Sequence, residues 1–128
     1  MSKPQQTMTI PEYKRLVSSK ATGRHISGEM NLTEQAYAND VLEPRKRAGE
    51  VVGYWFETIT LKLANGVRYT PDFFVRLVSD EYEFHEVKGG FIRDDARVKV
   101  RVAAEMFPFR FYLCQRISKR DGWSITLL

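Results

Sequence analysis

The middle of the chain alternates between apolar and polar positions, and this pattern predicts a β-sheet. Residues 51–64 are rich in Thr, Ile, Trp and Tyr, which is typical of a half-buried strand. Asn65-Gly66 follows, the pair that most readily adopts the positive φ values of a type I′ hairpin. Returning strands are predicted over residues 67–78 and, after a polar turn, over 83–88. Alternate residues of the first strand are expected to share one face: Trp55, Glu57, Ile59, Leu61 and Leu63.

Helical spacing of apolar residues precedes these strands. The pattern begins at a capping residue, Asn31 or Thr33, and ends at Gly49. Pro44 lacks a backbone N–H and crowds the carbonyl four residues back. The helix is therefore expected to kink at this proline, or to end near Leu42 and restart.

A second helix and two further strands complete the predicted order. The helix covers residues 96–106, with Asp94 or Asp95 as its cap and a basic side, and strands follow over 109–114 and 124–128. The order αβββαββ predicts an α/β (α+β) fold, a mixed central sheet flanked by helices. We expect a single domain over residues 29–128.

The composition of the chain limits where the protein can act and which metal sites it can form. The chain has 128 residues, of which 43% are hydrophobic, and no apolar run approaches the length of a membrane span. We therefore expect a cytoplasmic protein. One cysteine cannot form an internal disulfide, and two histidines are too few for a closed zinc site. Any metal is expected to be held by carboxylates.

The formal charge of +4 is concentrated at one end of the chain. Residues 1–28 hold five basic residues against one acidic residue, and the rest is formally neutral. We expect this segment to be a flexible basic arm that binds DNA through residues such as Lys14 and Arg15, because neutralising phosphates releases counterions.

Two acidic residues and a lysine are the strongest candidates for chemistry. Asp72 lies near the start of one predicted strand, and Glu86 and Lys88 lie at the end of the next, so a hairpin brings them together. Adjacent carboxylates are most readily offset by a divalent cation, and oxygen ligands favour Mg²⁺, with Mn²⁺ able to substitute. The main-chain carbonyl of Val87 is a candidate further ligand. Gly89 and Gly90 have no side chains, so a phosphate backbone can approach there.

These residues resemble the signature of the PD-(D/E)xK nuclease superfamily: Pro71-Asp72, a gap, and Glu86-Val87-Lys88. The resemblance is closest to small phage-encoded endonucleases of the Holliday junction resolvase-like type. It implies a restriction-endonuclease-like αβββαβ core, with Asp72 and Glu86 as metal ligands and Lys88 as the cation that positions water. It also implies that Glu34 supports the metal or its water and that Lys99 binds phosphate. Arg97 and Arg101 lie on the same basic helix.

Structural explanations compete with these roles. Asp72, Glu86 and Lys88 also fit an exposed salt bridge between strands, and Glu34 fits a plain capping residue. The basic helix fits a solvated face. Several other residues are interpreted as structural: His85 on the opposite side of the sheet, Cys114 as a buried thiol, Glu81 and Glu83 as turn charges, and Trp55, Phe73, Phe74, Phe109 and Phe111 as core.

The predicted activity is Mg²⁺-dependent cleavage of branched DNA, such as a Holliday junction or a flap, in phage recombination, replication or packaging. Symmetric cutting of a four-way junction implies a homodimer. The alternative is a protein with the same fold that binds DNA, or inhibits a host enzyme, without catalysis.

Overall fold

A computed structural model of the chain describes residues 28–90 and 94–128. Its main sheet has five strands, β1 (Val51–Phe56), β4 (Phe73–Leu77), β5 (Tyr82–Lys88), β6 (Arg110–Ser118) and β7 (Gly122–Leu127). They lie in the order β1-β4-β5-β6-β7. Only β5 and β6 are parallel, because helix α4 (Asp94–Met106) connects them, and the other pairs are antiparallel. The prediction of a mixed sheet in an α/β fold is confirmed.

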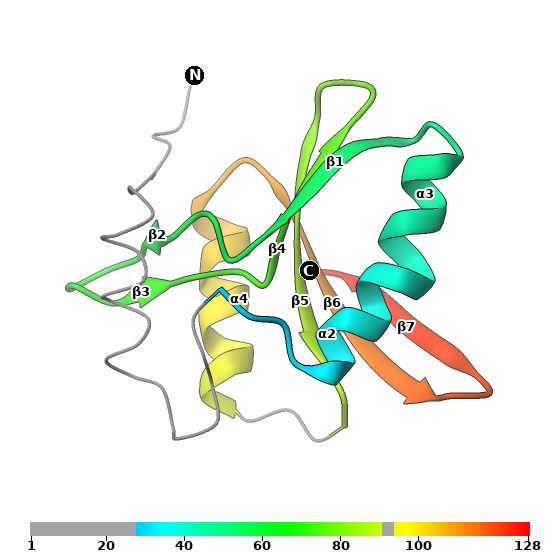
Figure 1. Ribbon diagram of the computed structural model, residues 1–128. Helices are drawn as coiled ribbons and strands as arrows, with labels where there is room; N and C mark the ends of the chain where they lie inside the picture. The colour runs from blue at the N-terminus through cyan, green and yellow to red at the C-terminus, as the bar shows by residue number, and fades with distance from the viewer. Residues whose placement is uncertain (1–27, 91–93) are drawn as a thin grey trace.

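Helices cover both faces of the sheet (Figure 1). On one face, α2 (Leu32–Tyr37), the π-helical turn η1 (Ala38–Leu42) and α3 (Glu43–Arg47) form one continuous helical segment. Its buried residues pack on alternate residues of the central strands, which include Phe73, Val75 and Val87. On the other face lies α4 together with the small hairpin of β2 (Leu61–Lys62) and β3 (Arg68–Tyr69). The apolar residues of this second core include Phe84, Val100 and Phe111.

The first helix passes through Pro44 without the predicted end near Leu42. The π turn directly before the proline is the reason: it bonds residue i to i+5, as Glu43 N–H does to Ala38 C=O. The wider turn provides a helical path that tolerates the missing N–H of Pro44, which lies in the first turn of α3. The helix ends where predicted, because Gly49 adopts a φ of +84°.

The prediction of one long strand over residues 51–64 is wrong, because the strand is interrupted in the middle. Glu57 adopts a φ of +50°, which ends β1 and turns the chain into the separate β2–β3 hairpin. The predicted strand over 67–78 is likewise divided, since β3 belongs to the small sheet and β4 to the main one. The type I′ turn is confirmed, with φ values of +52° at Asn65 and +77° at Gly66.

Trp55 does not lie in the core, contrary to the prediction from alternation. Its side chain is 43% exposed, because β1 is an edge strand and the indole lies over Gly53. A Cβ atom on Gly53 would come within 3.0 Å of that ring. Phe73, Phe111 and Cys114 are fully buried as predicted. No helix among the described residues is long and apolar enough to cross a membrane.

Candidate active site

The open end of the β4–β5 hairpin, opposite its turn, brings the three main candidate side chains together. Phe73 of β4 pairs with His85 of β5, so Asp72, one residue earlier, lies across from Glu86. The carboxylate of Asp72 reaches the next residue of β5 and accepts a hydrogen bond from the backbone N–H of Val87, with 2.7 Å between N and Oδ2. Lys88 Nζ lies 3.1 Å from Glu86 Oε2. The hairpin therefore forms the cluster expected from the sequence.

The surroundings of Asp72 disfavour a negative charge. Burial raises the pKa of its carboxyl well above the usual range, and the charges of Glu86 and Glu34 raise it further. The ammonium of Lys88 and the N–H of Val87 oppose this rise without cancelling it. The positive charge of Lys88 and the hydrogen bond from Val87 therefore do not fully offset the negative charge of the site.

Lys88 is held in its charged form by the same cluster. Burial alone would lower the pKa of its ammonium, but the negative charges of Glu86 and Asp72 outweigh burial and raise it. Its side chain stays 30% exposed, so the charge remains within reach of solvent. The geometry excludes the exposed salt bridge between strands, because Glu86 and Lys88 belong to one strand and the Glu86 side chain is buried.

Tyr69 is a member of the cluster that sequence reasoning missed. Its hydroxyl donates to Glu86 Oε1 over 2.6 Å, and its buried ring belongs to the small hairpin. Burial raises the pKa of this hydroxyl well above its usual value, and the nearby charge of Glu86 adds to the rise, so Tyr69 stays a donor. Its position three residues before Asp72 was the only signal in the sequence.

Glu34 lies in the first turn of α2 and is buried. Its Oε1 accepts the backbone N–H of Asn31 at 2.8 Å, and Asn31 Oδ1 accepts the N–H of Glu34 at 2.8 Å, which is a complete capping box. The capping role weighed against catalysis is therefore present. Glu34 is also close enough to raise the pKa of Asp72 and of Lys88 through its charge. Glu34 therefore caps its own helix and also lies near the acidic cluster.

The two glycines after β5 differ in their surroundings. A Cβ atom on Gly89 would lie 3.0 Å from Thr33 Oγ1, so the first turn of α2 occupies the space above Gly89. Nothing lies within 4 Å of a Cβ atom on Gly90. Of the two glycines predicted to let a phosphate approach, only Gly90 has open space where a Cβ atom would lie.

The donor set suits one kind of metal. In the described part of the chain, no three His, Cys, Asp or Glu side chains are arranged to hold an ion together. Zinc and all-protein calcium sites are thus unsuited to this cluster. Mg²⁺ differs, because it is held by one or two carboxylates and keeps several waters. The Asp72 and Glu86 pair, with the Val87 carbonyl beside it, fits that mode, and Glu34 could then act on the ion through one of those waters and not as a direct ligand.

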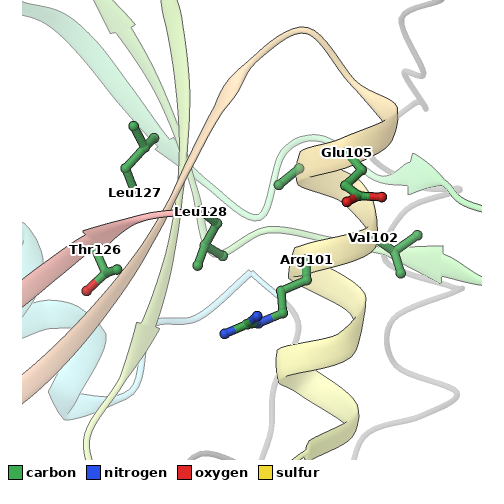
Figure 2. A pocket seen from close by; sticks show the side chains of 7 residues that line it. Arg101, Val102, Glu105, Thr126, Leu127 and Leu128 are labelled. Carbon is green, nitrogen blue, oxygen red and sulfur yellow. The ribbon is translucent and has the colours of Figure 1, made fainter.

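The predicted DNA-binding residues lie in several places. Arg97 is exposed and Lys99 is half-buried on α4, which begins four residues after Gly90. Arg101 lines a groove of about 590 Å³ between α4 and the end of β7, together with Glu105 and Leu128 (Figure 2). That groove contains no residue of the acidic cluster. Lys14 and Arg15 lie outside the described residues, and the side chains of the predicted helix caps Asp94 and Asp95 are likewise not described.

Comparison with known proteins gives no information about the function of this chain. No family model, curated protein or solved structure matches this chain.

A second structural interpretation of the sequence, besides that of Trp55, is wrong. Glu83 is not a turn charge: it is 3% exposed in β5 and lies 2.9 Å from the ring nitrogen of His85. His85 faces away from Glu86, as the alternation predicted, and is fully buried. Buried, hydrogen-bonded polar residues thus lie on both faces of β5.

Proposed function

We propose that this chain is a divalent-metal-dependent DNA endonuclease built on a restriction-endonuclease-like PD-(D/E)xK core. The observation that carries the proposal is the Asp72–Glu86 pair, two buried carboxylates at neighbouring strand ends with Lys88 beside them. Burial and repulsion raise the pKa of Asp72, which is the electrostatic condition that a bound cation relieves. The order of helices and strands supports the same core.

Each residue has a distinct role in this proposal. Asp72, Glu86 and the carbonyl of Val87 hold Mg²⁺ or Mn²⁺, and Tyr69 fixes one oxygen of Glu86. The ion would polarise the phosphoryl oxygen and neutralise the charge that develops on it. Lys88 orients the attacking water and stabilises negative charge next to it. Glu34 acts as a supporting acid from α2.

The proposed substrate is branched DNA. The described fold has a five-stranded sheet, four helical elements and a two-stranded hairpin, with no additional module for reading base sequence. Arg97 and Lys99 are proposed to contact phosphates, together with the basic residues of the N-terminal segment, and such contacts position DNA without sequence preference. A homodimer is proposed for symmetric cutting of four-way junctions.

The test is a cleavage panel with the purified full chain. Labelled four-way junction, flap, single strand and linear duplex are incubated with Mg²⁺, with Mn²⁺ or with EDTA. The expected result is metal-dependent cleavage of a branched substrate that is lost in Asp72→Asn. Lys119→Ala, an exposed lysine in the turn before β7, serves as the control and should cut normally. Folded wild-type protein that cuts none of the four substrates with either metal would overturn the proposal.

A further inference from the structure

A buried chain of hydrogen bonds crosses the face of the sheet opposite the candidate site. Tyr37 Oη lies 2.6 Å from His85 Nδ1, and His85 Nε2 lies 2.9 Å from Glu83 Oε1. The carboxylate of Glu83 only accepts hydrogen bonds, so Nε2 carries the hydrogen and Nδ1 accepts from the hydroxyl of Tyr37. Burial lowers the pKa of His85, which keeps the ring neutral and suits this arrangement.

Both ends of this chain are satisfied. Arg45 Nη1 lies 3.5 Å from Glu83 Oε1 and Arg110 Nη1 lies 3.8 Å from Glu83 Oε2. At the other end the thiol of Cys114 donates to Tyr37 Oη over 3.1 Å. The network therefore joins the first helical segment to β5 and β6 through directional bonds, in a region where an unpaired polar group would be destabilising.

The π turn explains how two side chains of one helical segment, Tyr37 and Arg45, both contact this network. Tyr37 is the last residue of α2 and Arg45 lies in α3, eight positions later. In a regular α-helix such residues differ in direction by about 80°. The residue inserted by a π turn shifts the phase by about 100°, which brings the two side chains within about 20° of each other. Both side chains therefore point at β5, where Tyr37 contacts His85 and Arg45 contacts Glu83.

Two attachments to the end of β5 flank Glu34. On one side Thr33 packs against Gly89, where a Cβ atom would come within 3.0 Å of its hydroxyl oxygen. On the other side Tyr37, one helical turn after Glu34, bonds to His85, the residue directly before Glu86. The capping box fixes the carboxylate of Glu34 relative to its own helix. The position of that helix on β5 then decides where Glu34 lies relative to Asp72 and Glu86.

We propose that Tyr37 and His85 are positioning residues: their bond locks α2 onto β5 and so sets the distance of Glu34 from the metal-binding carboxylates. The proposal rests on the proposed function, because it assigns the bond to a metal site. Neither residue touches the ion. Removing the bond should let the first turn of α2 shift and weaken the hold on the metal and its water, while the rest of the core is retained.

The test compares two tyrosines that each tie the first helical segment to the sheet. Tyr37→Phe removes only the hydroxyl bonded to His85. Tyr54→Phe removes a hydroxyl of β1 that donates to Glu43 of α3, away from Glu34. Binding of Mn²⁺ alone to each protein is measured by the loss of the free-ion EPR signal, after thermal unfolding has shown that both are folded. Loss of a residue that orients metal ligands typically weakens metal affinity about 10–100-fold. We expect a rise of at least about tenfold in the Mn²⁺ dissociation constant for Tyr37→Phe, and less than about twofold for Tyr54→Phe.

Other outcomes overturn the inference. If Tyr37→Phe fails to fold, the triple variant Tyr37→Phe, His85→Leu and Glu83→Leu removes all three polar side chains of the buried chain and is measured in its place, with the same expected loss of affinity. Equal Mn²⁺ affinities in the Tyr37 and Tyr54 variants, with a wild type that cuts DNA, would refute the positioning role and leave the nuclease standing. A folded wild type that neither binds Mn²⁺ nor cuts DNA would overturn both.

Discussion

Asp72→Asn is predicted to make the protein more stable while it abolishes metal binding. In the folded state the pKa of Asp72 is raised by burial and by the neighbouring carboxylates, so the folded protein holds this proton at pH values where the unfolded chain has released it. Stability is therefore lost as pH rises from the unfolded pKa, about 3.9, through the raised folded value. Above the unfolded pKa the carboxyl of Asp72 therefore costs stability, either through the proton that the folded state takes up or through a buried charge, and an uncharged amide removes that cost.

The size of the effect follows from two opposing contributions. The carbonyl oxygen of the introduced amide keeps the hydrogen bond from Val87 N–H, but a neutral acceptor is weaker than a carboxylate by about 1 kcal/mol. Against this, burying a charge without a full set of partners costs several kcal/mol. A net gain of about 1–3 kcal/mol is expected, comparable with other substitutions that relieve a strained functional site. In a chain of 128 residues this raises Tm by about 3–5 °C per kcal/mol.

Thermal unfolding in EDTA measures this directly, at neutral pH and again near the ordinary aspartate pKa of about 3.9, where the advantage of Asp72→Asn should shrink. Adding Mn²⁺ at about 100 times its dissociation constant should then stabilise the wild type by about 2.7 kcal/mol and leave the variant unchanged. A variant that melts below the wild type in EDTA at neutral pH would contradict this prediction, because Asp72 would then be a satisfied structural carboxylate.

Two further substitutions and one labelling experiment test the site and the fold. Tyr69→Phe removes the hydroxyl that donates to Glu86 and should lower the free energy of unfolding by about 1.5–3 kcal/mol in EDTA; an unchanged urea midpoint would contradict this. Gly66→Ala places a side chain at a φ of +77° and should cost about 1–2 kcal/mol, with an unchanged m value; equal stability would mean that the turn tolerates a Cβ. Burial raises the pKa of the Cys114 thiol to about 12, so a thiol reagent should label it far more slowly in native buffer than in urea, and rapid native labelling would show an open core.

Local signals in the sequence predicted the parts of the fold that local physics decides. Asn65-Gly66 specifies its turn through φ preference alone, and the observed φ values agree. The alternation in β5 placed Glu86 and Lys88 on one face and His85 on the other, which the register confirms. These features depend on neighbours in sequence, so one chain is enough to read them.

Tertiary contacts decided the parts that the sequence did not predict. The strand over 51–64 breaks because Glu57 adopts a positive φ, with its N–H bonded to the carbonyl of Asp72 across the sheet. Trp55 is exposed because its strand is at the edge, a property of strand order and not of alternation. The π turn places Tyr37 and Arg45 in phase with partners 48 and 38 residues later in the chain, His85 and Glu83. No local pattern encodes those pairings.

The most direct test of the nuclease is to separate DNA binding from DNA cleavage at Lys88. Lys88→Ala removes the ammonium that lies 3.1 Å from Glu86 Oε2 but leaves both carboxylates in place. Binding of a labelled four-way junction is measured in EDTA, and single-turnover cleavage of the same junction in Mn²⁺. The variant is expected to bind the junction with an affinity close to that of the wild type and to cut it at least about 100-fold more slowly. Cleavage by the Lys88→Ala protein at the wild-type rate would contradict the catalytic role, and junction binding without cleavage by either protein would favour a DNA-binding protein on the same fold.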